Sequence, residues 1–343
     1  MFARAGQPAR ENRGNAEAEP VASRRESTGR FDRGEKTGHL SLIPHRGIIR
    51  QAVSFPGSPY NPAMRFAQIT IVGVGLIGGS IGLAAKARGI ACQVVGVGRA
   101  ARNLSRAAEL GALDSFTTDL AEGVKSADLV VVCTPVDRIA EMILTAASHC
   151  KLGTIFTDAG STKVGIVNAI QRTILEGMHF VGSHPLAGSE KVGVEHARAN
   201  LFEDRVTVVT PTPRTDEPAC SAVIGFWTAL GSRVLRMTPE EHDEDLAVTS
   251  HLPHAVAAAV AGSTSRDLLP LTAGGFRDVT RIAAGDPELW AAIFLANRDA
   301  LRLALATFSE RMTEFRQLLE AGDGAGLVRW LAEGKQVRDA LGS

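Results

Sequence analysis

Three glycines spaced as Gly73-x-Gly75-x-x-Gly78 are the feature that most constrains how this chain can fold. They follow the β-branched run AQITIV and open an apolar, alanine-rich stretch typical of a helix. In a strand–turn–helix setting this spacing allows a tight turn, a close approach of a pyrophosphate to the backbone, and close packing of helix on strand. The N-terminus of the helix then faces the phosphates. The motif therefore predicts a dinucleotide-binding unit.

Short apolar runs alternate with helical stretches from Phe66 to Thr238. Continuous apolar strands of this kind are buried on both faces, as in a parallel sheet covered by helices. We expect an α/β fold with an N-terminal Rossmann-type, doubly wound sheet whose ligands lie at the carboxyl ends of the strands. After Thr238 only helical patterns follow, which predicts an all-α C-terminal domain. In GDPELW, Asp286 and Pro287 suit the start of a helix.

The pattern divides the chain into three segments. Residues 1–63 are rich in Arg, Gly, Pro, Ser and Glu, and they cannot bury enough apolar surface to offset their ordering entropy, so we expect a disordered leader. Because Met64 directly precedes the first expected strand, an over-called gene start is the alternative interpretation. Residues 64–238 are expected to form the dinucleotide-binding domain, and residues 239–343 a helical substrate domain.

The composition narrows the classes of partner. Lys plus Arg and Asp plus Glu balance at 37 each, so neither nucleic acid nor an anionic membrane is expected as a partner. No apolar run approaches the roughly 20 residues of a membrane span. The cysteines are scattered and form no CxxC pair, which argues against a disulfide framework or a zinc site and favours the reduced cytoplasm. They are Cys92, Cys133, Cys150 and Cys220.

The end of the second expected strand bears on cofactor choice. Sites for NAD place an Asp or Glu there to bind the ribose hydroxyls, whereas this chain has Gly98 followed by Arg99. No carboxylate repels a 2′-phosphate, and Arg99 or Arg102 can pair with one. The sequence therefore favours NADP, or use of both cofactors, over NAD alone. The alternative is that Arg99 is a solvated loop residue that stacks on adenine.

Several motifs in a fixed order resemble those of the prephenate/arogenate dehydrogenase family of tyrosine biosynthesis, over residues 66–320. They are GVGLIGGS (73–80), DAGSTK (158–163), SHPLAGSE (183–190), HDEDLAVTSHLPH (242–254) and GGFRDVTRIAAGDPELW (274–290). The resemblance implies oxidative decarboxylation of prephenate or arogenate, with hydride transfer to NAD or NADP. It also implies a homodimer formed through the C-terminal helices.

The same resemblance implies roles for individual residues. His184 in the HPxAG motif is expected to be catalytic, because a neutral histidine with a pKa near working pH can draw off a hydroxyl proton. Ser161 is expected near the nicotinamide and His184, although its position also suits a helix N-cap. Arg281 is expected to hold a substrate carboxylate in fork geometry. The other residues expected to line or gate the substrate pocket are Glu190, His251, His254 and Trp290.

The cofactor site is expected to combine the glycine loop with neighbouring strand ends. Its residues are Gly73, Gly75, Leu76, Ile77, Gly78, Arg99, Thr134, Pro135 and Ser161. Lys163 suits a helix surface better than a direct role. His251 and His254 are three residues apart and share a helix face, but they lack the acidic partner of an HExxH motif, so no metal site is expected.

Two other classes of protein fit parts of the pattern. A β-hydroxyacid or imine-type dehydrogenase shares a Rossmann domain followed by helices, but it uses a catalytic lysine on a helix of the second domain. The segment SHLPHAVAAAV contains no lysine. A non-catalytic redox sensor that only binds the nucleotide would not need His184 and Arg281 together.

A chain shortened to begin at Met64 should keep full activity and an unchanged melting temperature, because a disordered leader contributes no packing. Thermal unfolding and activity of the full and shortened chains provide the measurement. A clear loss of either would show that residues 1–63 pack on the body of the protein or order its site.

Overall fold

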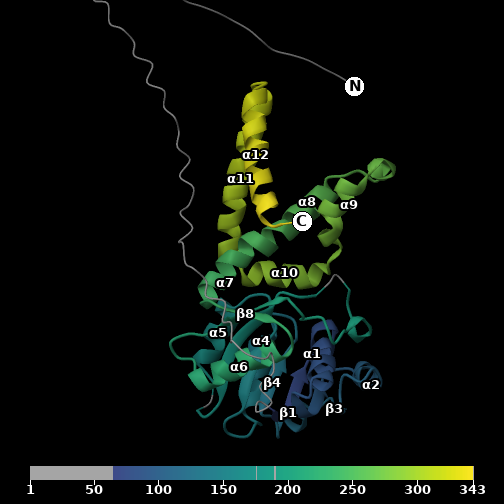
Figure 1. The fold of residues 1–343 in the computed structure, drawn as a ribbon, viewed down its shortest axis with the longest axis vertical. Helices are drawn as coiled ribbons and strands as arrows, with labels where there is room; N and C mark the ends of the chain where they lie inside the picture. Colours follow the sequence, from purple (N-terminus) through teal and green to yellow (C-terminus); the bar gives the residue numbers. More distant parts are fainter. Residues whose placement is uncertain (1–64, 175, 189–190, 343) are drawn as a thin grey trace, which may run out of the picture. The chain divides into compact units, whose positions relative to one another are not determined.

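The computed structural model describes residues 65–174, 176–188 and 191–342, so the expected leader lies outside the described residues. An eight-stranded sheet, in the lower part of Figure 1, has the strand order β3-β2-β1-β4-β5-β6-β7-β8. The strands are β1 (Phe66–Val72), β2 (Ala91–Val97), β3 (Ser115–Thr117), β4 (Leu129–Val132), β5 (Ile155–Asp158), β6 (His179–Pro185), β7 (Val206–Thr210) and β8 (Arg233–Arg236).

Helices connect the strands and then continue alone after β8. Those within the sheet region are α1 (Leu76–Ala87), α2 (Ala101–Glu109), α3 (Leu120–Val124), α4 (Ile139–Ala147), α5 (Val164–Gln171) and α6 (Glu217–Ala229). Those after β8 are α7 (Pro239–Leu246), α8 (Leu252–Gly262), α9 (Gly274–Thr280), α10 (Pro287–Ala296), α11 (Arg298–Glu320) and α12 (Gly324–Ala340). The predicted fold class, a Rossmann-type sheet followed by helices, is confirmed.

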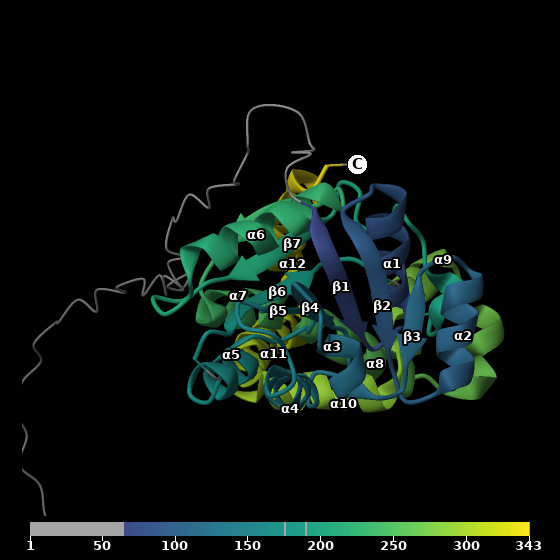
Figure 2. The same ribbon diagram turned by 90° about the horizontal axis from the view of Figure 1, so that it is seen from below.

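Alternate residues of the central strands pack into two separate cores. In β4, Leu129 and Val131 belong to the core formed with α1, α2 and α6, whereas Val130 and Val132 belong to the core formed with α3, α4 and α5. Figure 2 shows α1 and α6 on one side of the sheet and α3, α4 and α5 on the other. Since both faces are buried, the strands are apolar throughout rather than alternating in polarity.

The direction of the strands shows at which edge of the sheet a ligand is expected to bind. Strands β1 to β6 pair in parallel, and the order of connection reverses between β1 and β4. In such sheets ligands bind outside the carboxyl ends of the strands at this switch point. Only the β6–β7 pair within the described sheet is antiparallel, with His184 opposite Val208. The carboxyl end of β6 therefore lies at the ligand-binding edge, and β7 begins there.

The helical part begins with a well-defined N-terminus. In α7 the Thr238 side chain accepts the backbone N–H of Glu241, whose carboxylate accepts the backbone N–H of Thr238, which forms a capping box. The predicted helix start at Asp286 is also confirmed, because its carboxylate caps α10 by accepting the backbone N–H of Leu289. Farther along, α11 and α12 lie side by side (Figure 1).

Two helical glycines should respond in opposite directions to alanine. A Cβ atom added at Gly82 in α1 would lie 2.2 Å from the Ala112 carbonyl oxygen, whereas one added at Gly334 in α12 meets nothing within 4 Å. Gly82→Ala should lower the free energy of unfolding by about 1–3 kcal/mol through overpacking. Gly334→Ala should raise it by about 0.5–1 kcal/mol. Urea titrations measure both, and equal values would contradict close packing at Gly82.

Candidate active site

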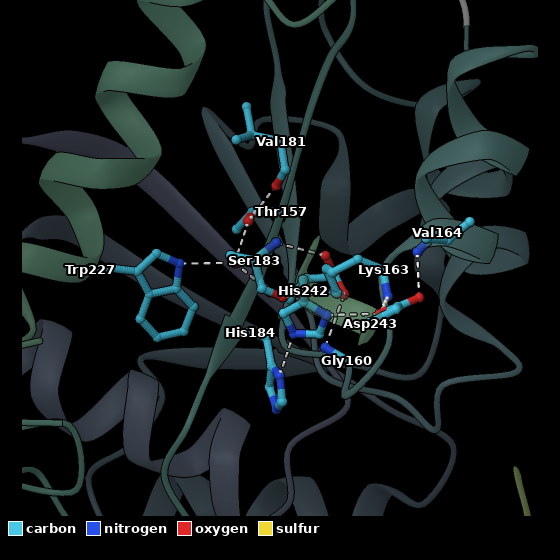
Figure 3. A network of polar contacts seen from close by, with 11 residues as sticks. Thr157, Gly160, Lys163, Val164, Val181, Ser183, His184, Trp227, His242 and Asp243 are labelled. Atoms are coloured by element: carbon cyan, nitrogen blue, oxygen red, sulfur yellow. Dashed lines mark hydrogen bonds and ion pairs between the residues drawn. The ribbon is translucent and has the colours of Figure 1, made fainter. Parts of the chain in front are cut away.

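The end of strand β6 is fixed by a buried hydrogen-bond network around Ser183 (Figure 3). The Ser183 backbone N–H donates to Asp158 Oδ1 at 3.0 Å, and its hydroxyl donates to the Asp158 carbonyl oxygen at 2.5 Å. The indole Nε1–H of Trp227, from α6, donates to the Ser183 hydroxyl at 2.9 Å. Because side chains alternate along a strand, the next residue, His184, extends from the opposite face and lines a cavity.

Lys163 belongs to this buried network, which makes the predicted helix-surface position wrong. Its side chain is completely buried, its Nζ pairs with the Asp158 carboxylate, and Nζ also donates to the Ser183 carbonyl oxygen at 2.8 Å. Burial lowers the pKa of Lys163, and the negative charge of Asp158 opposes this effect. The lysine ties the end of β5 to the end of β6 and does not line the cavity.

Two polar side chains of α7 extend a line of hydrogen bonds from His184. Its Nδ1 lies 2.9 Å from Nε2 of His242, and Nδ1 of His242 lies 2.8 Å from Oδ1 of Asp243 (Figure 3). The pKa of His184 lies well below its usual range, mainly because the ring is buried and secondly because His242 is close to it. Burial also lowers the pKa of His242, although the hydrogen bond to Asp243 opposes this. Both imidazoles are therefore neutral at neutral pH.

Asp243 joins the helical part to the sheet. Its Oδ1 accepts the backbone N–H of Lys163 at 2.7 Å, and its Oδ2 accepts that of Val164 at 2.9 Å. These N–H groups stand at the start of α5, where a carboxylate is favourable. The helix begins at Val164 with Lys163 as its N-cap, so the alternative role of Ser161 as an N-cap is wrong.

A cavity of about 950 Å³ opens beside His184, a size typical of small-molecule sites. The expected site residues that line it are Ser161, His184, His254, Arg281 and Trp290. The rings of His254 and Trp290 stack with their centroids 3.4 Å apart and form one wall. Arg281 reaches the cavity from a 3-10 helix, Arg281–Ala284. The fold thus gathers residues from β6, the loop after β5, α8, the segment before α10 and α10 itself.

His251 lies behind this wall rather than in it. It ends a π-helical turn, Ala247–His251, and is only 1% exposed. Its Nδ1 lies 3.0 Å from the Asn297 amide nitrogen, while its Nε2 has no hydrogen-bond partner. Burial lowers the pKa of His251 to about 4. Of the two expected pocket histidines, the structure places His254 on the cavity and His251 beneath it. The expected gating residue Glu190 lies outside the described residues.

Sequence models of two domains match consecutive parts of the chain. The prephenate dehydrogenase nucleotide-binding domain matches residues 81–236, and the prephenate dehydrogenase dimerization domain matches residues 238–333. A prephenate dehydrogenase of Bacillus subtilis is 35% identical over 280 residues, which cover 80% of this chain and 76% of that protein. The chain belongs to the prephenate dehydrogenase family. This confirms the resemblance inferred from the sequence motifs.

Other members of the family extend the comparison. A cyclohexadienyl dehydrogenase of Zymomonas mobilis is 35% identical over 285 residues, covering 80% of this chain and 96% of that protein. A crystal structure of prephenate dehydrogenase from A. aeolicus, in complex with hydroxyphenyl propionate and NAD+, superposes with a TM-score of 0.74. It is 33% identical, and the match covers 80% of this chain and 98% of that chain.

The glycine loop of this family member fits an NAD or NADP pyrophosphate. Gly73 has φ of +93°, and a Cβ atom there would lie 2.9 Å from the Cys133 backbone, so the turn requires glycine. At Gly75 an added Cβ would meet nothing within 4 Å, which leaves room for a ligand beside the start of α1. No side chain in the described part of the chain caps α1, and the buried Thr134 hydroxyl has no hydrogen-bond partner. The backbone N–H groups at the start of α1 and the Thr134 hydroxyl can therefore donate to phosphate oxygens.

The remaining predicted cofactor residues surround this loop. Arg99 and Pro135 are exposed in the loops that follow β2 and β4, respectively, and Leu76 and Ile77 begin α1. A Cβ added at Gly188 would lie 3.7 Å from Cδ1 of Ile77 in α1. The segment after His184 therefore packs against the first turn of α1. The glycine loop that fits the pyrophosphate and the cavity beside His184 are therefore neighbours.

The described residues hold neither a membrane-spanning helix nor a metal-ligand cluster. No helix among them is long and apolar enough to cross a membrane. Within residues 65–174, 176–188 and 191–342, no group of three His, Cys, Asp or Glu side chains could hold a metal ion.

Proposed function

We propose that this protein catalyses the oxidative decarboxylation of prephenate, or of arogenate, to 4-hydroxyphenylpyruvate or tyrosine, with NAD+ or NADP+ as the hydride acceptor. The observation that carries the proposal is the position of His184. Its ring borders a cavity that Arg281 also lines, next to the strand ends where a Rossmann sheet binds its nucleotide. Membership of the prephenate dehydrogenase family supports it further.

The reaction needs a base and an anchor on opposite sides of the substrate ring. The bound nicotinamide accepts the hydride from C4 of the ring. His184, neutral at neutral pH, takes the C4 hydroxyl proton as the C4–O bond becomes a carbonyl. The bond from C1 to its carboxylate then breaks, CO2 leaves, and the electron pair makes the ring aromatic. The proton on His184 returns to the resulting phenolate oxygen.

Other residues of the cavity hold the substrate in this orientation. Arg281 can bind a carboxylate through two N–H groups of its planar guanidinium. Ser161 lies on the same cavity as His184 and can donate a hydrogen bond to the C4 oxygen. The stacked pair of His254 and Trp290 offers a flat wall to the substrate. We assign Lys163 no contact with the substrate, since its side chain is completely buried.

The assembly and the domain limits belong to the same proposal. The C-terminal part matches a dimerization domain, and we propose a homodimer formed through the helices after Thr238, with the domain boundary at that residue. Several large apolar side chains of these helices are more than half exposed: Leu295, Leu303, Leu331 and Val337. The cysteines are all free, which supports a cytoplasmic location as part of the proposal.

Steady-state assays with prephenate and arogenate, each paired with NAD+ and with NADP+, test the proposed function. We expect formation of the reduced nicotinamide together with release of CO2 for at least one pair. An enzyme that turns over neither substrate with either cofactor would refute the proposal.

His184 and Arg281 should differ in their kinetic effects. His184→Asn should lower kcat by roughly 10²–10⁴-fold with little change in KM, because the base acts only in the transition state. Arg281→Ala should chiefly raise KM by roughly 10–150-fold, since it removes a charged hydrogen bond present in both states. Arg281→Lys should recover only part of this loss, because lysine lacks the planar fork.

His149→Asn is a matched control for the histidine variant, because His149 is exposed at the end of α4. Its kcat should equal that of the wild type. Near-normal kcat for His184→Asn would make His184 structural and would transfer the catalytic role to another residue, with Ser161 as the first candidate.

The enzyme should use NADP+ at least as well as NAD+, because Gly98 and Arg99 stand where an acidic residue would repel the 2′-phosphate. Gly98→Asp should shift the preference toward NAD+. A Cβ at this position lies 3.2 Å from Cδ2 of Leu104, so the Leu104 side chain must move by only a few tenths of an ångström to accommodate it. The ratio of kcat/KM for the two cofactors is the measurement. A hundredfold preference of the wild type for NAD+ would contradict this interpretation.

A further inference from the structure

Asp243 and His242 determine which ring nitrogen of His184 carries hydrogen. Both carboxylate oxygens of Asp243 accept backbone N–H groups from the start of α5, and Oδ1 also lies 2.8 Å from Nδ1 of His242. A carboxylate oriented in this way offers only acceptors. Nδ1 of His242 must therefore carry the hydrogen of that bond.

The next bond follows from the neutrality of His242. With its single hydrogen on Nδ1, the neutral ring presents a bare Nε2, which can only accept. This atom lies 2.9 Å from Nδ1 of His184. Two bare nitrogens cannot form a hydrogen bond, so Nδ1 of His184 carries the hydrogen. Neutral His184 then has a bare Nε2, the atom a general base needs.

We propose that His242, oriented by Asp243, is a positioning residue that holds His184 in the tautomer with its hydrogen on Nδ1. The function of that tautomer rests on the proposed dehydrogenase reaction, whereas the tautomer itself exists in the free protein. A His184 ring with its hydrogen on Nε2 could not accept the hydroxyl proton. Once His184 has taken that proton, its Nδ1–H donates from a charged ring, and the bond to His242 strengthens.

Asp243 is the residue that orients His242, because Lys163 and His251, the other titratable side chains nearby, are bound to other partners. From the connection between β5 and α5, Lys163 is bonded to Asp158 and to the Ser183 carbonyl oxygen. From the π-helical turn, Nδ1 of His251 faces the Asn297 amide.

The backbone of α7 also limits the freedom of His242. The ring is completely buried, and the helix begins at the Thr238 capping box only one turn earlier. Asp243 is held a second time, because its backbone carbonyl oxygen accepts the Asn297 amide at 2.7 Å. A ring with so little freedom is suited to fixing the orientation of its neighbour.

Nitrogen-15 NMR of protein labelled at histidine tests the tautomer without turnover. The ring nitrogens of neutral histidine give separate signals with and without hydrogen, and the absence of one set from a His184→Asn sample assigns it to His184. We expect the hydrogen of wild-type His184 on Nδ1 at neutral pH. In His242→Phe, which has a ring of similar shape but no nitrogen, we expect this preference to be lost.

Kinetics of two His242 variants separate positioning from a merely structural role. His242→Phe should lower kcat by about 10- to 100-fold with KM within about threefold, since one hydrogen bond to the charged base is lost. His242→Gln keeps an amide oxygen that can accept from Nδ1 of His184, so it should recover most of kcat. His149→Phe is the matched control on the surface, and its kcat and His184 signals should match those of the wild type.

Two results would overturn the inference. The first is a wild-type His184 with its hydrogen on Nε2, which remains measurable even if His242→Phe fails to fold. The second is an equal kcat for the Phe and Gln variants with an unchanged His184 tautomer. Failure of the proposed function is distinguishable, because it would show as no turnover of either substrate by the wild type while the NMR result still decides the tautomer.

Discussion

The carboxylate of Asp243 joins the two parts of the molecule at the point where the chemistry is proposed to occur. It accepts two N–H groups from the start of α5 in the sheet region, while its own helix, α7, belongs to the helical region. The same oxygen that holds α5 also faces His242. The packing of α7 against α5 and the orientation of the histidine pair therefore depend on one charged group. A displacement between the two regions would alter both at once.

Much of the fold could be predicted because its signals are local. The glycine spacing that ends at Gly78 needs only a turn between a strand and a helix, and the continuous apolar runs need only burial on both faces. The helix start follows from two neighbouring residues, Asp286 and Pro287. The motif containing His184 similarly indicated one side of the cavity before any geometry was known. Arg281 was found in the same way, and it lines the same cavity.

The supporting residues could not be predicted because their contacts join distant parts of the sequence. Asp243 is 80 positions from Lys163, and the acidic run in which it lies resembles a solvated first turn of a helix. Its pairing with the start of α5 is also the reason that Ser161 is not needed there as a cap. Lys163 was expected at a surface because its second partner, the Ser183 carbonyl oxygen, is 20 positions away on β6 and comes within reach only when β5 and β6 are placed side by side. Compensation of a buried charge requires knowledge of the tertiary fold.

The antiparallel pairing of β6 with β7 has a consequence for how this site can diverge. A parallel successor to β6 would have required a crossover that carries the chain to the far edge of the sheet. Because β7 instead runs back, residues 186–205 begin and end at the same edge as the cavity, and many of its lining residues come from this connection. Changes in the length or composition of this segment can reshape the cavity while every strand keeps its partner. Val194, Leu201 and Phe202 anchor this connection in the core, so substrate preference can evolve separately from the stability of the core at its exposed positions that line the cavity, such as Lys191 and Val192.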